Sequence, residues 1–398
     1  MKILMLTPYL PFPPSSGGQI RSYNLLKHLS KKHEITLFCY IRNKEEEKFV
    51  PLVKKYCKTI KVFVRRPAWH PFNIFLAGFT PYPFLVCIYL SSAFRKSVAA
   101  ELRENRYDLI HAETFYVMTN IPATPIPTLL VEQTIEYLVY KHYVESLQNP
   151  FLKGLLGIDV AKLKFWERAY WKKADKVVAV STSDRSEMLG LAEDLDVSLV
   201  PNGVNLEFFK VKESWKAAEP KILFVANFKW LQNIEAAELL LKEVFPIVRK
   251  EYPTSKLWIV GQHIPRRISD KADGGVIVDN LMEDDEESIR NAYFESSVFV
   301  SPLRGPGGTR LKHFAAMASK LPLVTTKVGA EGLGVKDGEE VIIRNRPKEI
   351  ATETVRLLKD PKRSRLMAEK ARILVETKYS WDNMSKLLDK LYLEAAHG

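Results

Sequence analysis

Residues 298–333 read VFVSPLRGPGGTRLKHFAAMASKLPLVTTKVGAEGL, and this stretch decides the fold. A short apolar run ends at Ser301, and a turn rich in glycine and proline follows it. A helical pattern then begins near Thr309, and a second apolar run starts at Leu321. Strand, glycine turn, helix and strand in this order form the repeating unit of a parallel sheet. The stretch therefore predicts an α/β fold.

The same stretch predicts an anion site. Its turn opens onto a helix N-terminus, where unpaired N–H groups and the helix dipole favour negative charge. Gly307 and Gly308 let the backbone approach an anion closely, and Arg310 and Lys312 add positive charge beside it. We interpret the pattern as a diphosphate site. An ordinary strand-to-helix turn with surface cations is the alternative that the spacing alone leaves open.

The length and charge of the chain limit the architecture and the partners. Its 398 residues suit two domains. The net charge of +12 favours an anionic partner, and residues 51–100 hold eight basic and no acidic residues. No nucleic-acid recognition motif accompanies this charge, so we expect no nucleic-acid partner. Three scattered cysteines without metal-binding spacing indicate reduced thiols in the cytoplasm.

Short apolar runs alternate with helical patterns through the first half of the chain, which predicts a doubly wound sheet. These runs lie at 3–6, 35–40, 60–64, 109–110, 129–131, 177–180 and 197–200. The loop after the first run ends in Gly17 and Gly18, before a helix expected near Gln19. Because open α/β sheets bind ligands at the carboxyl ends of their strands, the two glycines predict contact with a phosphate or sugar. A flexible turn is the alternative.

The segment 67–94 carries no charged residue and is long enough to span a membrane. Four prolines argue against one continuous helix. Basic residues flank the segment, and its aromatic residues include Trp69, Phe75 and Phe79. This composition suits an anionic membrane surface or a lipid-linked ligand, and burial in the core is the alternative. We expect a cytoplasmic protein, peripheral on the inner face of the membrane.

A second series of apolar runs follows the turn at 201–203. The charged segment 211–221 is the best candidate for a linker, and Ser183 is expected to cap a helix before it. The runs lie at 222–225, 257–260, 276–278, 298–300, 323–324 and 341–343. Asn227 and Lys229 follow the first of these runs, at the edge where Arg310 is also expected. Helical patterns complete the chain, the last of them at 381–394.

Several pieces of the chain, in this order and spacing, resemble the retaining glycosyltransferases of family 4. The pieces are TPYLPFPPSSGGQIRSYNLLKHL, ADKVVAVSTSDR, VPNGVNLEFF, ILFVANFKWLQNIEAAELL, LWIVG and PLRGPGGTRLKHFAAMASKLPLVTTKVGAEGL. The resemblance covers nearly the whole length. It implies the GT-B fold, an α/β architecture in which two Rossmann-like domains face a central cleft. The implied parts are an acceptor domain (1–203), a nucleotide-sugar domain (204–376) and a C-terminal helix that crosses back to the first domain (377–398).

The resemblance also implies a reaction. Such an enzyme moves a sugar from a nucleotide-diphospho-sugar to the hydroxyl of a sugar or lipid-linked acceptor, in envelope polysaccharide or glycolipid synthesis. Lys229, Arg310 and Lys312 would neutralise the diphosphate as it leaves. The donor-binding positions implied are Asn227, Lys229, Gly307, Gly308, Thr309 and Ala315. Gly17 and Gly18 would contact the acceptor, and no metal or other cofactor is implied.

Two positions depart from the family pattern. Ala315 stands where the family usually has a glutamate that holds the nucleotide ribose, and an alanine cannot accept the ribose hydroxyl bonds, each worth about 0.5–1.5 kcal/mol. The second glutamate of that pair is replaced by Gly307. In place of an H-x-H motif after a first-domain strand, this chain has His111 and Glu113. One of these two catalytic candidates is expected to face the sugar, with Glu132 and Glu136 as weaker candidates for acceptor contact.

Ala315 leaves other function classes open. The chain could be a catalytically impaired binding or scaffold protein with the same fold, whether natural or engineered. A nucleotide-sugar epimerase of similar architecture, which would need no acceptor, is a third reading. Restoring glutamate at position 315 separates an altered enzyme from a scaffold.

Overall fold

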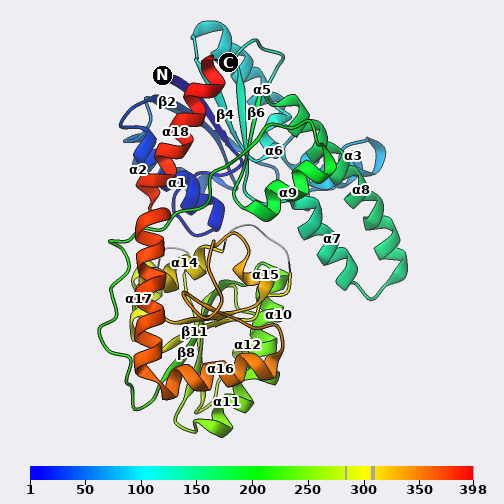
Figure 1. The fold of residues 1–398 in the computed structure, drawn as a ribbon. Helices are drawn as coiled ribbons and strands as arrows, with labels where there is room; N and C mark the ends of the chain where they lie inside the picture. Colours follow the sequence, from blue (N-terminus) through cyan, green and yellow to red (C-terminus); the bar gives the residue numbers. More distant parts are fainter. Residues whose placement is uncertain (283–284, 306–309, 398) are drawn as a thin grey trace. The chain divides into compact units, whose positions relative to one another are not determined.

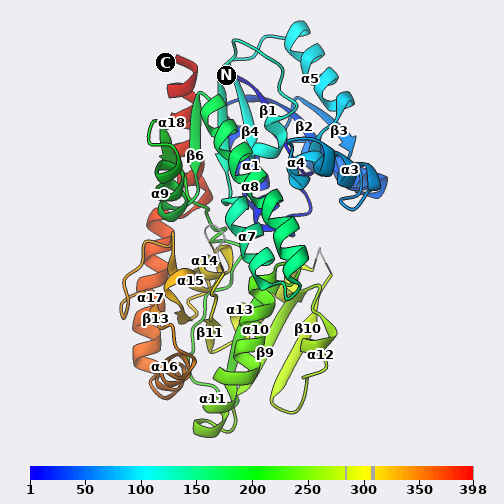
Figure 2. The same cartoon turned by 90° about the vertical axis from the view of Figure 1, so that its right-hand side faces the viewer.

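The computed structural model describes residues 1–282, 285–305 and 310–397, and it divides into two compact units. Unit 1 contains residues 1–201 and 384–398, and unit 2 contains residues 202–383. Each unit is a parallel β-sheet with helices around it (Figures 1 and 2). The first division of the chain, after Pro201, lies two residues before the expected domain boundary at 203. The chain returns to unit 1 at Met384, seven residues after the expected position 377.

Unit 1 is built on a seven-stranded sheet with the order β3-β2-β1-β4-β5-β6-β7, in which neighbouring strands pair in parallel. The strands are β1 (Lys2–Thr7), β2 (Glu34–Ile41), β3 (Thr59–Val64), β4 (Leu109–Glu113), β5 (Thr128–Glu132), β6 (Lys176–Ala179) and β7 (Val197–Leu199). Each predicted apolar run of this half coincides with one of these strands, and the runs 177–180 and 197–200 each extend one residue past the strand end. Continuous apolar runs form such strands because helices cover both faces of the sheet. The strand order reverses between β1 and β4, the kind of point where α/β sheets bind ligands.

The helices of unit 1 surround this sheet, and one of them comes from the end of the chain. They are α1 (Gly17–Leu29), the 3-10 helix η1 (Lys44–Phe49), α2 (Val50–Lys54), α3 (Pro71–Phe79), α4 (Phe84–Tyr89), α5 (Ser92–Glu104), α6 (Phe115–Met118), α7 (Glu136–Ser146), α8 (Pro150–Lys173), α9 (Thr182–Leu191) and α18 (Trp381–His397). In α18, Asp389 pairs with Lys32 at 2.6 Å and with His33 at 2.7 Å. These ion pairs attach the end of the chain to unit 1.

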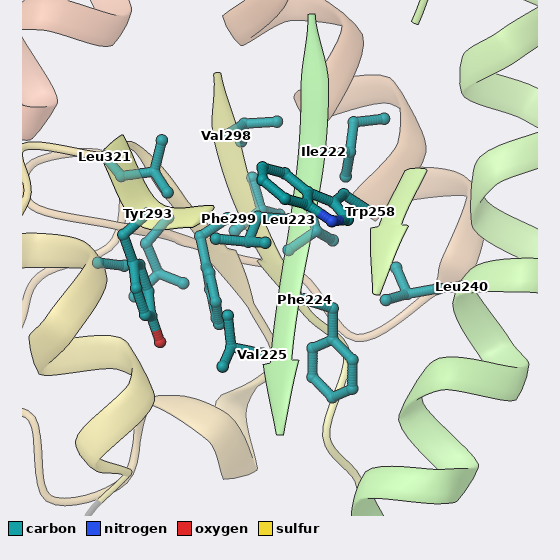
Figure 3. Close-up of a cluster of buried hydrophobic side chains, with 14 of the residues drawn as sticks. Ile222, Leu223, Phe224, Val225, Leu240, Trp258, Tyr293, Val298, Phe299 and Leu321 are labelled. Carbon is teal, nitrogen blue, oxygen red and sulfur yellow. The ribbon is translucent and has the colours of Figure 1, made fainter. Parts of the chain in front are cut away.

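Unit 2 has a six-stranded sheet with the order β10-β9-β8-β11-β12-β13. The strands are β8 (Lys221–Asn227), β9 (Lys256–Gln262), β10 (Val276–Asn280), β11 (Val298–Ser301), β12 (Leu323–Thr325) and β13 (Ile342–Ile343). All predicted apolar runs of the second half lie on these strands. Figure 3 shows the buried side chains on β8 and its neighbours, where Phe224, Phe299 and Tyr293 fill the core. The order reverses between β8 and β11, which places the ends of these two strands beside each other.

The helices of unit 2 are α10 (Leu231–Leu239), the π-helix η2 (Leu240–Val244), α11 (Phe245–Glu251), α12 (Arg266–Ser269), α13 (Glu286–Glu295), α14 (Leu311–Ala318), α15 (Lys327–Ala330), α16 (Pro347–Lys359) and α17 (Pro361–Lys378). Helix α14 was predicted from about Thr309. It begins at Leu311, with Arg310 as its N-cap residue.

Three local predictions were wrong. Segment 211–221 is not a free linker, because Lys212 is buried and donates hydrogen bonds through its backbone N–H to the Ser319 carbonyl at 3.1 Å and through Nζ to the Phe294 carbonyl at 3.0 Å. The cap of α9 is Ser181 rather than Ser183, because the Ser181 hydroxyl accepts the N–H of Asp184 at 3.0 Å. Gly17 and Gly18 lie in the first turn of α1, not in the loop before it.

Segment 67–94 forms α3, α4 and the start of α5, so its prolines divide it as predicted. None of the helices in the described part of the chain combines the length and the hydropathy that a membrane crossing needs. Asn73 lies on the buried side of α3, and its Nδ2 donates to the carbonyls of Pro67 and Ala68 at 3.0 and 3.1 Å. The aromatic side chains Phe72, Phe75 and Phe79 remain exposed.

Candidate functional site

In unit 2, polar side chains gather where β8 and β9 end. Asn227, the last residue of β8, donates through Nδ2 to Gln262 Oε1 at 3.1 Å. Its own carbonyl accepts from Asn233 Nδ2 at 2.7 Å. The Asn227 Oδ1 atom accepts the backbone N–H of Lys229 at 3.1 Å, which holds the exposed Lys229 directly after the strand. Asn233 and Gln262 were not predicted, although Asn233 lies within one of the quoted pieces and Gln262 directly follows another.

Lys312 joins this polar group from the first turn of α14. Its Nζ donates to Asn233 Oδ1 at 2.6 Å and lies 5.0 Å from the centre of the Phe224 ring. Burial, and then the positive charge of Arg310, hold the pKa of Lys312 well below its usual value. Part of the residue remains accessible to solvent. An anion placed beside Nζ would reverse this pKa change, because an opposite charge favours the protonated amine.

Arg310 is buried and lies at the N-cap of α14. Its Nη2 donates to the Gly305 carbonyl at 2.7 Å, which ties the side chain to the start of the glycine turn. The predicted backbone donors Gly307, Gly308 and Thr309 lie outside the described residues. Arg310 and Lys312 therefore place two cations at the N-terminus of one helix, an arrangement suited to an anion with more than one negative charge.

Ala315 and His313 lie on the same helix, and both are buried. Ala315 is 6% exposed and belongs to the hydrophobic core of unit 2. His313 is fully buried with its ring 5.9 Å from that of Phe299. Burial, followed by the charges of Lys312 and Arg310, holds the pKa of His313 well below its usual value, so the ring is neutral. Neither residue adds a charge that could hold a ribose.

A close backbone contact fixes the neighbouring strand end. Gly261 lies on β9 directly beside Ala226 of β8. A Cβ atom at Gly261 would lie 1.8 Å from the Ala226 carbonyl oxygen. Only glycine fits there, because neither backbone can move without breaking the sheet pairing.

In unit 1, His111 and Glu113 lie on β4 with both side chains fully buried. His111 Nε2 is 3.3 Å from Glu113 Oε1, and His111 Nδ1 is hydrogen-bonded to the hydroxyl of Tyr392 in α18. Burial opposes ionisation of Glu113, but His111 and Arg21 outweigh it and hold the pKa of Glu113 below its usual value. The prediction that one of the pair faces the sugar is not met in this structure, since neither residue reaches solvent.

Gln133 and Tyr9 connect this buried pair to the surface of the unit. Gln133 Nε2 donates to Glu113 Oε2 at 2.5 Å and to the Tyr9 hydroxyl at 2.7 Å. Both residues are partly exposed, and both directly follow the strands β5 and β1 that flank β4. Sequence reasoning missed them, although their positions after apolar runs were a usable signal.

Gly18 belongs to the same group. A Cβ atom there would lie 2.4 Å from Gln133 Oε1 and 2.6 Å from the Tyr9 hydroxyl. The glycine backbone therefore packs directly against the two exposed polar side chains, while Gly17 beside it is exposed. Thr114, which follows Glu113, has φ 65°. Such backbone costs about 1–3 kcal/mol and is found most often at functional sites.

Glu132 and Glu136, the weaker acceptor candidates, lie in a different group. Glu132 Oε1 accepts from Trp171 Nε1 at 3.1 Å, inside unit 1. Glu167 accepts the backbone N–H of Glu136 at 2.7 Å and that of Tyr137 at 2.9 Å. Burial raises the pKa of Glu136 to about 7. These contacts tie α7 to α8 and do not present Glu132 to an acceptor.

Two family models match this chain. Residues 15–208 match the model described as Glycosyltransferase Family 4, and residues 219–360 match Glycosyl transferases group 1. The chain is a glycosyltransferase, with the family 4 match in its first half and the group 1 match in its second.

Similar proteins agree with this family. An uncharacterized 44.6 kDa protein in the cps region of Klebsiella pneumoniae is 23% identical to this chain. The matched region spans 86% of this chain and 87% of the Klebsiella protein. Alpha-monoglucosyldiacylglycerol synthase of Acholeplasma laidlawii is 22% identical, covering 76% and 79%. Both are similar over most of their length.

Solved structures show the fold. Sucrose-phosphate synthase from Thermosynechococcus elongatus superimposes with a TM-score of 0.72 at 18% identity over 99% of each chain. HepE from Anabaena, in complex with UDP and glucose, has a TM-score of 0.65 at 14% identity over 99% of this chain and 100% of its own. The glycosyltransferase therefore has the GT-B fold predicted from its sequence.

Within the described residues, no three His, Cys, Asp or Glu side chains gather as a metal site. We call the positive groups of unit 2, with their partner Asn233, the cation site (Lys229, Arg310, Lys312 and Asn233). We call the polar group of unit 1 the acceptor-side group (Tyr9, Gly18, His111, Glu113 and Gln133).

Proposed function

We propose that the glycosyltransferase moves a sugar from a nucleotide-diphospho-sugar to an acceptor hydroxyl and retains the anomeric configuration. The observation that supports the donor class is the pair of cations at the start of α14, the buried Arg310 and the partly buried Lys312. Two cations held near each other at the N-terminus of one helix suit a diphosphate. The HepE structure, which contains UDP and glucose, supports a nucleoside diphosphate as the leaving group.

The cation site would act on the bond that breaks. As the glycosidic C–O bond to the diphosphate lengthens, negative charge grows on the phosphate oxygen. Cations already fixed at that position stabilise the transition state more than the ground state, which lowers the barrier. We propose that the departing phosphate oxygen takes the acceptor's proton, which is how attack on the same face retains the configuration.

No metal is needed in this proposal, because protein cations meet the diphosphate charge. Lys229 is the third of them, held after β8 by its backbone bond to Asn227. The enzyme is therefore expected to keep its rate in excess EDTA. A loss of activity that Mg²⁺ or Mn²⁺ restores would contradict this part of the proposal.

In unit 1, Gln133 and Tyr9 are the side chains proposed to contact the acceptor. Glu113 and His111 are positioning residues: the ionised Glu113 holds the Gln133 amide, and His111 holds Glu113. Gly18 leaves room for this arrangement. An acceptor hydroxyl could hydrogen-bond to the Gln133 side chain or to the Tyr9 hydroxyl.

Ala315 favours a modified way of holding the nucleotide. Its side chain lies in the core of unit 2, so this part of α14 offers the ribose no carboxylate. We expect donor affinity to come mainly from the diphosphate. Ala315→Glu should raise donor affinity if the ribose lies there; an unchanged affinity together with no turnover would favour an impaired binding protein.

The acceptor is proposed to be a polysaccharide precursor or a glycolipid at a membrane surface. The names of the two relatives mention a cps region and a monoglucosyldiacylglycerol. Exposed apolar side chains of α3 and α8 support membrane association; they are Phe72, Ile74, Phe75, Phe79, Phe151, Leu152, Leu155, Ile158 and Phe165. Co-sedimentation with anionic vesicles at low and high salt tests this, and binding that ignores salt would contradict the role of the basic charge.

The deciding experiment measures nucleotide release. Purified enzyme is given UDP-sugars and GDP-sugars with a lipid extract as acceptor, and free UDP or GDP is followed. Release that needs both donor and extract is expected, and NMR of the product should show the donor's anomeric configuration. If no donor releases nucleotide, or if the sugar is rearranged without any acceptor, the transferase proposal fails.

A further inference from the structure

A cavity of about 340 Å³ lies in unit 1, away from the acceptor-side group. It is lined by Arg66, Phe72, Leu76, Leu90, Ser91, Ser92, Arg95, Thr119 and Asn120. These residues come from the end of β3, from α3, from the start of α5 and from the segment after α6. The volume is at the small end of the range for ligand pockets, about 300–1,000 Å³. It suits a compact head group and is small for a whole nucleotide-sugar.

The charge of this pocket is positive. Arg66 donates through Nε to Asn73 Oδ1 at 2.9 Å and through Nη2 to the carbonyls of Cys87 and Leu90 at 3.2 and 3.1 Å. Its Nη1 has no hydrogen bond to any described residue. Arg95 is exposed, and its side chain has neither a hydrogen bond nor an ion pair within the described part of the chain. Since no lining residue is acidic, Arg66 Nη1 and the Arg95 guanidinium group are available to an anion.

The polar wall of the pocket is held in place by hydrogen bonds. Asn120 accepts the backbone N–H of Ser91 at 3.2 Å and donates to the Tyr89 carbonyl at 2.9 Å. The Tyr40 hydroxyl donates to the same carbonyl at 2.7 Å. Segment 89–91 is thereby fixed beside Asn120 before any ligand arrives. A preformed polar wall lowers the cost of binding.

The opposite wall is apolar and continues out of the pocket. Phe72 and Leu76 line it, and they share one face of α3 with Phe75 and Phe79 because these positions follow helical spacing. The Phe75 and Phe79 rings are 4.8 Å apart and both side chains are more than half exposed, at 56% and 79%. Asn73 on the other side of α3 is buried. One apolar stripe thus connects the cationic pocket to the exposed aromatic surface.

Helix α8 holds the end of α3 and the start of α4 in place by hydrogen bonds. Lys162 Nζ donates to the carbonyls of Ala77 and Thr80 at 2.7 and 2.9 Å, which closes the end of α3. Asp159 accepts the backbone N–H of Phe84 at 3.0 Å, at the start of α4. Figure 2 shows α3 and α4 side by side in unit 1. The stripe is therefore a fixed surface of the unit.

We propose that this pocket binds the phosphate group of an anionic membrane lipid, whose hydrocarbon chains lie along Phe72, Phe75, Leu76 and Phe79. Guanidinium groups form strong charge-assisted hydrogen bonds to phosphate oxygens. The apolar wall continues from the pocket to the exposed surface, so it can contact the hydrocarbon chains of a lipid, which inorganic phosphate lacks. The inference deepens the membrane association proposed above and rests on it, and it adds a specific head-group site to a general attraction.

The pocket can be tested without a membrane. The ³¹P signal of dihexanoyl phosphatidic acid, below its micelle concentration, is followed while full-length enzyme is added; dihexanoyl phosphatidylcholine and inorganic phosphate are titrated in parallel. Phosphatidic acid is expected to bind at least about tenfold more tightly than either, because only it combines a dianionic phosphate with apolar chains. Equal binding of inorganic phosphate would overturn the lipid assignment.

Arg95→Gln is the informative variant, and Lys96→Gln is its matched control. Both residues are exposed on α5, and each change removes one positive charge, but only Arg95 lines the pocket. Losing a hydrogen bond to a charged group weakens binding about 10- to 150-fold, whereas a screened exposed charge changes it less than about threefold. Equal losses in the two variants would overturn the site and leave only general attraction.

Phe79→Ser tests the apolar stripe, with Phe151→Ser on α8 as its control. The first should weaken binding of monomeric phosphatidic acid about tenfold and leave inorganic phosphate unaffected; the second should change neither. Vesicles of phosphatidylcholine with about one fifth phosphatidic acid test the membrane proposal separately. Vesicle binding that persists at full strength in Arg95→Gln refutes the pocket and keeps the membrane proposal, while absence of vesicle binding by the wild type refutes both.

Discussion

Replacing Lys312 by methionine should weaken diphosphate binding without destabilising the protein. Methionine has nearly the same length and fills the space beside Phe224, but it removes the charge and the 2.6 Å bond to Asn233. A cation about 4 Å from a phosphate, at an effective dielectric constant near 20, contributes about 4 kcal/mol. Because Lys312 is partly exposed, we expect a loss of about 2–4 kcal/mol, or roughly 30- to 1,000-fold in the Kd for UDP.

Stability should change little, or rise. Removing a buried charge is often neutral or stabilising by about 1–4 kcal/mol, while leaving Asn233 Oδ1 without its partner costs about 1–3 kcal/mol. These two effects nearly cancel. A lysine with a purely structural role would behave differently, since the unpaired Asn233 Oδ1 would then cost up to about 3 kcal/mol without an offsetting gain.

The pH dependence of UDP binding gives a second measure of the same residue. The pKa of Lys312 is lowered in the free protein, and bound diphosphate would raise it. Binding therefore takes up a proton, so UDP affinity should fall as pH rises through the lowered pKa of the free protein. In Lys312→Met this contribution to the slope should vanish.

Isothermal titration with UDP and with GDP, together with urea unfolding, measures both quantities. Lys271→Met is the matched control, because Lys271 follows α12, ahead of the amino end of β10, and is exposed. It should leave UDP affinity unchanged. If Lys312→Met unfolds more easily by about 3 kcal/mol and binds both nucleotides as tightly as the wild type, the cation site has been misread.

Three further predictions concern unit 1. Gly18→Ala should lower kcat/KM for the acceptor about tenfold or more with little change in Tm, because the new Cβ would meet only the flexible end of Gln133 and the Tyr9 hydroxyl; a normal acceptor rate would contradict the proposed contact. Tyr392→Phe should cost about 1–3 kcal/mol in urea unfolding, since it leaves a ring nitrogen of buried His111 unpaired, and an unchanged midpoint would refute this. Glu136 has a pKa raised to about 7, so the folded state binds more protons than the unfolded state between about pH 4.5 and 7. The free energy of unfolding should therefore fall by at most about 3 kcal/mol as the pH rises through that window. Urea titrations at pH 5 and pH 8 should show a smaller fall in Glu136→Gln.

The sheets could be predicted from the sequence because their signal is local. A run such as 222–225 is apolar throughout, and only a strand covered on both faces buries every side chain of such a run. The strand ends could be found in the same way, and they led to Asn227, His111, Glu113 and Gly18. What could not be predicted was which of these side chains would be exposed. His111 and Glu113 are fully buried, because α18 and Gln133 cover them.

The hydrogen-bond partners of the site residues could not be predicted from the sequence either. Lys312 was expected to face an anion, and the structure adds Asn233, 79 residues earlier, as the group that holds it. The pocket between Arg66 and Arg95 was not visible in the sequence, where the surrounding aromatic residues indicated only a membrane surface or a buried core. Segment 67–94 has both a buried and an exposed side, since Asn73 is buried while Phe79 is exposed.

The sequence by itself determined the segments that become strands, the glycine turn with its two cations, and the family pattern that follows from their order. Each of these depends on residues within one short stretch, whose burial or turn geometry is set by its own side chains. Only the tertiary structure decided which side chains meet: Tyr392 reaches His111 across 281 residues, and Arg66 and Arg95 line the same cavity. The reason is that such contacts depend on strand order and helix packing, which no single stretch contains.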